Sequence, residues 1–534
     1  MIDMAKTSKP AAPDETLKNL EREANSRLQD ARGQKDLVVK DLQESYFFTR
    51  PRLSRDVSSR SAPSKRIEDV DDLATGIGPE VSEDFATELI SAFFPQNVRW
   101  AESTADAAVL AGIEENSAEM NDLKKLLPVY DATVFAAINA SNFNAELATS
   151  LDPDASLGTV AWWIDAPGGG RPYRAEHVPT RELEFNVGPD GEIDDRFRVR
   201  HVTASKIRSV LPDQELPVDV ERKIQSNSKA KIEIAWGFWR DWSKPHDDEW
   251  IHVLLVDRKL VHHTTLSGFG CLPLIIARLS PDKLHAWGNG PAIKSLQEFR
   301  ILDVITAATQ DHVDLALSPP FAYPDDGILN FEGGLESGKG YPKRPGQRGE
   351  IEKLYFGGDA DLGFYTVADL EKKVRRKFFA DYPEQRGDTP PSATQWMDEM
   401  VRSQRRIGTP GLKFWREGPY EVFRRFEYLL DKDGKLDPIE VNGSKITVTP
   451  NNPATQAQDA QKLQTAGNLL NAIKGYFPVT SQAAIDEMST IENMKRLSKD
   501  EVITLRDKET ATQLVQQILT QAAGGPEGGD NGAS

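Results

Sequence analysis

A glycine-rich loop with one lysine carries the residue types closest to those of a catalytic motif in this chain. Residues 333–340 read GGLESGKG, and Lys339 has the spacing of the lysine in a phosphate-binding loop. Such a loop needs a hydroxyl after the lysine for its metal ion, and a helix whose N-terminus faces the phosphates. Gly340 lacks the hydroxyl, and Pro342 and Pro345 prevent a helix from starting there. Nucleotide hydrolysis through Lys339 is therefore retained only as an alternative, enzymatic hypothesis.

The histidines and acidic residues show no spacing that would hold a metal ion. His262 and His263 are adjacent, and neighbouring side chains of a strand point to opposite faces. The remaining histidines lack the H-x-x-x-H and H-E-x-x-H spacings of zinc sites. Acidic pairs such as Asp194-Asp195 occur beside turn residues, where solvated carboxylates are expected. Because no G-x-S-x-G sequence marks a nucleophilic serine either, we predict no catalytic residue, no metal and no cofactor.

Basic residues cluster on one predicted helix, between residues 367 and 380. Its apolar residues fall at helical spacing and are expected to pack inward; they are Leu370, Val374, Phe378 and Phe379. Its basic residues spread over the rest of the helix surface; they are Lys372, Lys373, Arg375, Arg376 and Lys377. A solvated helix end with cations favourable to the helix dipole explains this pattern. The alternative is a positive surface for a partner, next to the polar loop 382–391 that contains Gln385 and Arg386.

The composition is that of a folded, acidic protein without disulfides. The chain has 534 residues, 39% of them hydrophobic, which is enough for several domains or one elaborate subunit of an assembly. Its formal net charge of −18 argues against a protein that binds nucleic-acid phosphates over its whole surface. The single cysteine, Cys271, suits a reducing cytoplasm and is expected to be buried. We find no signal peptide and no apolar run of about 18 residues, so no membrane partner is expected.

The longest helical pattern lies between two proline signals, and the other elements can be arranged around it. It begins after the turn Gly288-Asn-Gly290, with Pro291 at its first position, and it ends before Pro319-Pro320. Apolar side chains recur along it at helical spacing. Such a stripe must be covered, either by the same chain or by a neighbouring copy.

Helical and strand patterns elsewhere predict a mainly helical α+β fold. Before the long helix, helices are expected over 14–48, 81–94 and 101–149, the last broken by Pro128, followed by strands over 157–278 with a helical interruption at 204–228. After it come a Gly/Pro-rich segment with short strands at 320–364, a helix at 366–381, a helical stretch at 392–430 broken at 408–411, and helices at 455–475, 481–488 and 499–522.

The order of these motifs resembles that of the head-to-tail connector, or portal, proteins of short-tailed bacteriophages. The resemblance covers roughly residues 15–475 and rests on motifs in chain order: Phe94-Pro95 with Arg99-Trp100, Ser141-Asn142-Phe143, Leu157-Gly158-Thr159, Phe197 to Arg200, Gly288 to Ala292, Pro319-Pro320, Thr389 to Trp396, Pro419 to Leu430, and the helix after Thr449-Pro450. The chain departs from the family pattern at Gln395, where a helix start with glutamate is usual, and at the break 408–411. The course of the helix after residue 391 is the part these departures affect.

The resemblance implies a portal-type subunit, with about twelve copies in a ring around a channel for double-stranded DNA. It assigns residues 1–287 to the wing, 288–319 to a first stem helix, 320–364 to the clip, 365–381 to a second stem helix, 382–391 to a tunnel loop, 392–450 to a broken helix and β unit returning to the wing, 451–522 to crown helices and 523–534 to a flexible tail. The long helix would then pack against the same helix in the next copy and against the second stem helix of its own chain.

The resemblance also implies where partners would bind. The candidates for contact with channel DNA are Lys372, Lys373, Arg375, Arg376, Lys377, Gln385 and Arg386. The candidates for contact with the packaging motor and the tail lie in the clip and are Lys339, Lys343, Arg344 and Arg348. The implied partners are a terminase, tail adaptor proteins and the major capsid protein, and the implied location is the portal vertex of the virion, with assembly in the host cytoplasm. A tail adaptor or scaffold-like phage protein remains the structural alternative.

Overall fold

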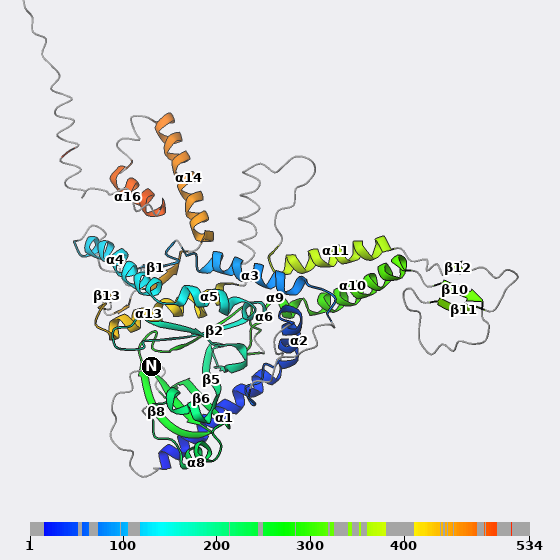
Figure 1. Cartoon of the computed structure of the whole chain (residues 1–534). Helices are drawn as coiled ribbons and strands as arrows, with labels where there is room; N and C mark the ends of the chain where they lie inside the picture. Colours follow the sequence, from blue (N-terminus) through cyan, green and yellow to red (C-terminus); the bar gives the residue numbers. More distant parts are fainter. Residues whose placement is uncertain are drawn as a thin grey trace, which may run out of the picture. The chain divides into compact units, whose positions relative to one another are not determined.

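The computed structural model describes residues 15–51, 56–62, 73–96, 98–104, 118–212, 214–243, 249–282, 285–318, 321–324, 340–343, 352–353, 360–380, 411–437, 439–441, 444–445, 447–451, 453–477 and 487–498, together with 485 and 514 (Figure 1). The chain divides into two compact units, Met1–Asn452 and Pro453–Ser534. Both helices and strands are abundant, as expected for an α+β fold.

The first unit contains a five-stranded antiparallel sheet with the strand order β4-β5-β6-β7-β8. Its strands are β4 (Leu183–Val187), β5 (Ile193–Thr203), β6 (Lys231–Arg240), β7 (Glu249–Val256) and β8 (Lys259–Ser267). The short helices α7 (Ile207–Val210) and α8 (Val218–Ser226) lie between β5 and β6, where a helical interruption was predicted. Hydrophobic residues of α1 (Glu15–Asp36) pack on this sheet, with Leu28 only 2% exposed.

Cations of α1 bind the same sheet through ion pairs that local sequence patterns do not predict. The Lys35 ammonium donates to the Glu184 carboxylate at 3.2 Å and to the Leu183 carbonyl at 2.9 Å, and all of these groups are buried. Arg27 donates to Asp195 at 2.8 Å. Asp195 lies in β5 and is 7% exposed, so the expectation of a solvated turn carboxylate was wrong there. Its partner is 168 residues away in the sequence, which is why the turn-like context misled.

A second antiparallel sheet, ordered β3-β2-β9, lies against the helices of the first unit. Its strands are β2 (Thr159–Asp165), β3 (Arg174–His177) and β9 (Leu274–Arg278). The Trp162 side chain of the central strand is fully buried, and its ring contacts those of Phe94 and Phe143 at centroid distances of 6.0 and 6.2 Å. The helices that share this core are α2 (Val39–Thr49), α3 (Ile77–Phe93), α4 (Ala118–Ala140), α5 (Phe143–Leu151), α6 (Asp154–Leu157) and α13 (Pro419–Lys432).

Two local expectations about this part of the chain were wrong. Residues 101–104 form strand β1 (Ala101–Thr104) and not a helix, because they pair with β15 (Thr447–Pro450) from a distant part of the chain. Pro128 lies inside α4 and does not end it. The proline removes one backbone donor, but the buried side chains of Tyr130, Val134 and Ile138 hold the following turns against the core.

A pair of helices extends from this body (Figure 1). The predicted long helix is divided at Ser295 into α9 (Pro291–Lys294) and α10 (Leu296–Leu317). It packs against α11 (Ala360–Lys377), which begins several residues before the predicted start of that helix. Between α10 and α11 lie three short strands with the order β11-β10-β12, namely β10 (Phe321–Pro324), β11 (Gly340–Lys343) and β12 (Glu352–Lys353).

The second unit contains the helices α14 (Pro453–Tyr476) and α16 (Glu487–Ser498). The predicted helix at 455–475 is thus confirmed. Of the one predicted at 481–488, the structure describes 485, 487 and 488, and α16 continues to Ser498, past the predicted end. Of the one predicted at 499–522, only residue 514 is described. None of the side chains described in this unit is buried, and Tyr476 is 81% exposed. In the described part of the chain, no helix combines the length and the apolar character needed to cross a membrane.

Candidate functional site

The predicted basic helix and the long helix meet along an apolar seam, as their spacing indicated. Phe299 and Leu302 of α10 and Val374 of α11 are fully buried, and so is Phe378, directly after α11. The Phe299 ring stacks on Phe48 of α2 at 5.1 Å and meets the Phe378 ring at 6.0 Å. The helix pair is therefore joined to the body by aromatic packing at its base.

Arg375 and Lys377, two of the five basic residues of α11, bind carboxylates of other helices. Arg375 donates to both carboxylate oxygens of Glu80 on α3, at 2.9 and 3.0 Å. Lys377 donates to Glu298 on α10 at 2.5 Å and to the Lys294 carbonyl at 2.9 Å. These ion pairs connect α11 to α3 on one side and to α10 on the other.

The other three basic residues of α11 lie on its exposed side. They are Lys372, Lys373 and Arg376. Lys373 forms an i,i+4 ion pair with Asp369 at 2.7 Å, which raises the pKa of its ammonium. The structure thus separates the predicted basic cluster into residues that join elements and residues that form an outward-facing surface.

An acidic face on α3 lies beside this end of α11, and the sequence interpretation missed it. Glu80, Asp84 and Glu88 follow one another at i,i+4 spacing, which places them on one side of the helix. Burial raises the pKa of Glu88, and the nearby Asp84 raises it further. The pKa of Asp84 is also raised, first by burial and then by Glu80, while Arg375 opposes the shift. The i,i+4 spacing of the three acids was the signal available in the sequence.

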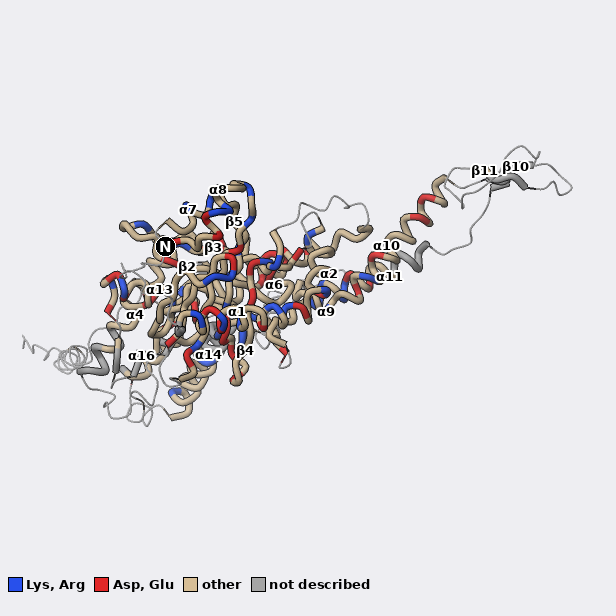
Figure 2. Tube along the Cα trace, turned by 90° about the horizontal axis from the view of Figure 1, so that it is seen from below, with Lys and Arg blue, Asp and Glu red and all other residues tan. Residues whose placement is uncertain are grey.

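The side of α10 that faces away from α11 is apolar and uncovered in the single chain. Ile301 is 50% exposed and Val304 is 68% exposed, although both belong to a helix whose opposite side is buried. The outer half of α10 carries aspartates and no lysine or arginine, as the red positions along it show (Figure 2). This helix pair therefore presents an apolar stripe with acidic flanks.

The turn that starts α9 fits closely against the end of α6. The backbone N–H of Gly290 donates to the Leu157 carbonyl at 3.2 Å, and that of Leu279 donates to the Gly158 carbonyl at 2.8 Å. A Cβ on Gly290 would lie 2.2 Å from the Ser156 oxygen, and one on Gly288 would lie 1.9 Å from the Gly158 oxygen. The glycines of this turn are required because two backbone segments touch there, and the contact fixes the helix pair on the body.

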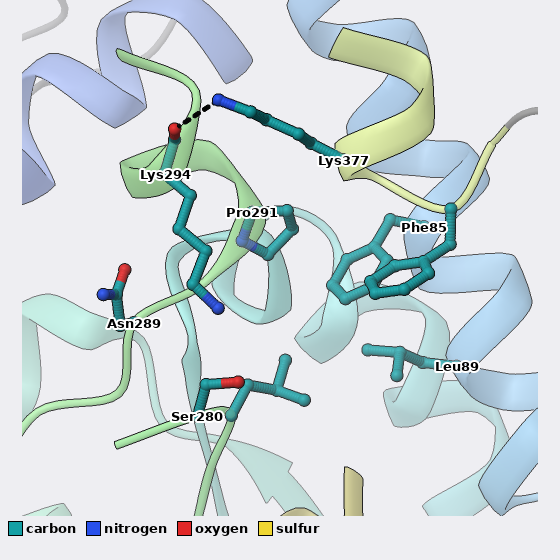
Figure 3. Close-up of a pocket in the computed structure, with 9 residues that line it drawn as sticks. Phe85, Leu89, Ser280, Asn289, Pro291, Lys294 and Lys377 are labelled. Atoms are coloured by element: carbon teal, nitrogen blue, oxygen red, sulfur yellow. Dashed lines mark hydrogen bonds between the residues drawn. The ribbon is translucent and has the colours of Figure 1, made fainter. Parts of the chain in front are cut away.

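A small cavity of about 160 Å³ lies at the same junction (Figure 3). Its walls are mostly apolar and include Phe85 and Leu89 of α3 and Pro291 of α9 (Figure 3). The Lys294 side chain extends along it, and burial lowers the pKa of this ammonium. The polar residues that line it are Ser280, Asn289, Lys294 and Lys377, and no acidic residue lines it.

The remaining predicted site residues are placed only in part. Gln385 and Arg386 of the DNA-channel set lie outside the described residues, as do Lys339, Arg344 and Arg348 of the clip set. Lys343 ends strand β11, whose backbone alone is described. The loop 333–340 is likewise outside, apart from Gly340 at the start of β11.

The described residues contain no cluster of three or more His, Cys, Asp or Glu side chains able to hold a metal ion. The free thiol of Cys271 is buried, as predicted. The buried His252 ring bonds to the Gly237 carbonyl, and the buried Arg278 guanidinium donates to the Glu417 carboxylate.

Comparison with models of protein families shows the family to which the chain belongs. The model of a family described as "Bacteriophage head to tail connecting protein" matches residues 21–498. The chain therefore belongs to this family of phage connector proteins. The match includes the helices and strands that carry the resemblance seen in the sequence, and it confirms the connector assignment without distinguishing short-tailed phages from others.

Two of the solved structures found as similar come from gene transfer agent (GTA) particles. One is a chain of the "Neck of empty GTA particle computed with C6 symmetry", with a TM-score of 0.37, 11% identity, and coverage of 79% of this chain and 90% of that one. Another is from the "Virion of native gene transfer agent (GTA) particle", with a TM-score of 0.35, 11% identity, and coverage of 74% and 86%. Among curated proteins, no match was found.

Proposed function

We propose that this connector is a portal subunit of the short-tailed phage type, with about twelve copies forming a ring at one capsid vertex. The ring encloses a channel through which double-stranded DNA is packaged and ejected. The observation that carries this proposal is the uncovered apolar stripe of α10, with Ile301 and Val304 more than a third exposed on a helix that extends from the body.

A neighbouring copy is the partner that suits this stripe. An exposed apolar stripe on a helix is unfavourable in water, so it marks a surface that is covered in the functional state. Every copy presents the same stripe at the same place, and a rotational arrangement buries all of them with one repeated contact. The second stem helix of the same chain, α11, already covers the opposite side of α10.

Within this ring, 288–319 and 365–381 form the stem, 320–364 the clip, 382–391 the tunnel loop, 1–287 with 392–450 the wing, and 451–522 the crown. Gln385 and Arg386 of the tunnel loop face DNA in this arrangement. The clip residues Lys339, Lys343, Arg344 and Arg348 dock a packaging terminase and later the tail adaptor, and the wing contacts the major capsid protein. The acidic chain, with its formal charge of −18, repels DNA and lets it slide.

The ring is tested by mass photometry and negative-stain electron microscopy of the purified full-length chain. We expect particles of ring mass with a central hole wide enough for duplex DNA. Monomers or dimers alone at high protein concentration would refute the ring. A closed assembly without such a hole would favour the tail-adaptor alternative.

The DNA path is tested by charge reversal in the tunnel loop. The substitution Arg386→Glu is expected to lower DNA packaging or genome retention, because it places a negative charge against the phosphates, while rings still form. Packaging equal to that of the unmodified protein would show that Arg386 does not face DNA.

We also propose that the chain hydrolyses no nucleotide, since the loop at 333–340 lacks the hydroxyl needed for a metal ion. ATPase and GTPase assays on the unmodified ring should give no turnover above the buffer. Turnover that disappears in Lys339→Ala would contradict this proposal.

A further inference from the structure

The acidic face of α3 is only partly neutralised within one chain. Arg375 binds Glu80, but among the described residues no cation lies within ion-pair distance of Asp84 or Glu88. Both of these carboxyl groups have raised pKa values, because burial and the carboxylate one turn before each of them disfavour their charged forms. A cation brought from outside the chain would relieve both effects.

On the outward face of α11, Arg376 has the opposite deficiency. Arg376 is exposed, and no carboxylate of the described residues lies within ion-pair distance of its guanidinium. Lys372 lies one helical turn before it, on the same side of α11, and is also exposed. The backbone N–H of Phe379 is bonded to the Arg376 carbonyl at 3.4 Å, so Arg376 lies at the end of the helix that is fixed to the body.

The two faces match in charge, spacing and position. Asp84 and Glu88 are four residues apart on α3, and Lys372 and Arg376 are four residues apart on α11. Both pairs lie near the base of the helix pair, where the Phe379 ring stacks on the Phe85 ring at 6.0 Å. A rotational ring joins two different surfaces of the same chain, so each copy must carry both complementary faces. This chain does.

We propose that Arg376, flanked by Lys372, binds the carboxylates of Asp84 and Glu88 on α3 of the neighbouring copy, so that each contact in the ring is closed by charge pairs beside the apolar stripe. The inference rests on the proposed ring and specifies which faces of adjacent copies meet. It takes Lys372 and Arg376 out of the set of residues facing DNA. It leaves Gln385 and Arg386 in that set.

The interaction is tested by reversing the charge of each face in the full-length chain. One variant carries Lys372→Glu and Arg376→Glu, and the other carries Asp84→Lys and Glu88→Lys. Each variant alone places like charges across every contact, so the protein concentration needed for half-maximal ring assembly should rise by about tenfold or more. Ring assembly is followed by mass photometry without DNA.

Mixing the two variants provides the decisive measurement. In a ring of alternating copies, the acidic α11 of one variant meets the basic α3 of the other, and the remaining contacts have their usual signs. We therefore expect a 1:1 mixture to assemble at a concentration close to that of the unmodified chain. A chain carrying all four substitutions should also assemble, since its contacts are inverted but complementary.

Charge effects are separated from folding effects by controls. Arg222 is a highly exposed residue of α8, and Lys206 lies on the surface just before α7. The double variant Arg222→Glu and Lys206→Glu lowers the net charge as much as the Lys372→Glu, Arg376→Glu variant does, without changing either face. It should assemble like the unmodified chain. The single variants Arg376→Gln and Glu88→Gln remove one charge each and should also weaken assembly. Raising the salt concentration should weaken assembly of the unmodified chain, and it should weaken assembly of a Glu88→Gln, Arg376→Gln double variant less.

The outcomes distinguish this inference from the proposed function. Rings that form normally from either charge-reversed variant would overturn the α3–α11 pairing and leave the ring itself established. Loss of assembly that mixing does not restore would also overturn it. Normal rings from the Lys372→Glu, Arg376→Glu variant with reduced DNA packaging would show that this face binds DNA instead. Absence of rings from the unmodified chain would refute the proposed function first.

Discussion

His252 is the buried titratable group whose environment is most clearly defined in the large sheet. It is 0% exposed in β7, its Nδ1 is bonded to the Gly237 carbonyl at 3.1 Å, and its ring stacks on Phe238 at 4.4 Å. Burial lowers the pKa of His252 from 6.5 to about 4, and the nearby His262 also lowers it. The imidazole is therefore neutral in the folded protein at pH 7.

The lowered pKa of His252 predicts that the first unit loses stability in mild acid. The unfolded chain binds a proton at this histidine below about pH 6.5, whereas the folded chain does so only near pH 4. The free energy of unfolding therefore falls as the pH drops through this window, by up to about 3 kcal/mol from this group. Urea unfolding between pH 7 and 4 measures it. His252→Gln, which does not titrate, should show a shallower fall, and equal slopes would contradict the assignment.

Arg278 is another buried group that joins distant parts of the chain. Its side chain is 1% exposed at the end of β9, and it donates to Glu417 at 2.9 Å, to the Ala286 carbonyl at 2.9 Å and to the Gly191 carbonyl at 3.2 Å. Glu417 ends the helical residues 411–417. One guanidinium thus connects three segments beside the base of the helix pair.

Removing the charge of Glu417 is expected to be costly. Glu417→Leu leaves the buried Arg278 without its counter-ion, which lowers the free energy of unfolding by about 3–5 kcal/mol. The adjacent pair Arg416–Glu192 is a matched control, since its side chains are 74% and 56% exposed. Arg416→Gln should cost less than about 1 kcal/mol. Similar losses for both variants in chemical denaturation would mean that burial does not govern the Arg278 pair.

At the scale of elements, the contact between the α9 turn and the end of α6 determines how the helix pair is held. Gly158 has φ of 103°, in the left-handed region that favours glycine, and its backbone touches both Gly288 and Gly290. Three glycines therefore form one close backbone crossing. The Phe299 ring completes the attachment, since it stacks on Phe48 and meets Phe378 edge to face.

A methyl group in this crossing should destabilise the first unit. In Gly290→Ala the new Cβ would lie 2.2 Å from the Ser156 oxygen and 2.4 Å from the Gly158 nitrogen, so the backbones must separate. We expect a loss of about 2 kcal/mol or more, measured by thermal and urea unfolding. The control is Gly33→Ala in α1, where no atom lies within 4 Å of the new methyl group. This change should be neutral or stabilising by up to about 1 kcal/mol.

At the scale of the whole molecule, the apolar stripe on α10 is a surface that the folded single chain leaves uncovered. The single chain buries Phe299 and Leu302 but leaves Ile301 and Val304 exposed, so folding of one copy does not require the stripe. In the proposed ring, the neighbouring copy covers these two side chains. The second unit, whose described side chains are all at least partly exposed, is consistent with the same view.

Charged residues in the stripe should therefore prevent assembly and leave the fold intact. In the double variant Ile301→Asp and Val304→Asp, two carboxylates would be buried in each contact, and we expect the ring fraction to fall by about tenfold or more. The thermal transition of the monomer should change little. Val218→Asp, at an equally exposed valine of α8, is the control. Intact rings from the α10 variant would show that another surface closes the ring.

Local sequence patterns were sufficient for much of the fold. The spacing of Leu370, Val374 and Phe378 correctly identified the buried side of α11, and the alternating pattern over 157–278 correctly located the sheets. Pro128 and residues 101–104 were assigned wrongly because their conformation depends on distant contacts. The strand β1 exists only because β15 pairs with it, and no local pattern indicates such a partner.

The sequence by itself determined the helical periods, the acidic balance, and the order of motifs that identifies a phage connector, since these depend on neighbouring residues or on composition. Only the tertiary structure decided which charges are available to a partner. Arg375 and Arg376 are adjacent in the sequence, yet Glu80 binds the first while the second faces outward. The physical reason is that an ion pair is set by the position of a carboxylate from a remote helix, and that position is fixed by packing, not by spacing along the chain.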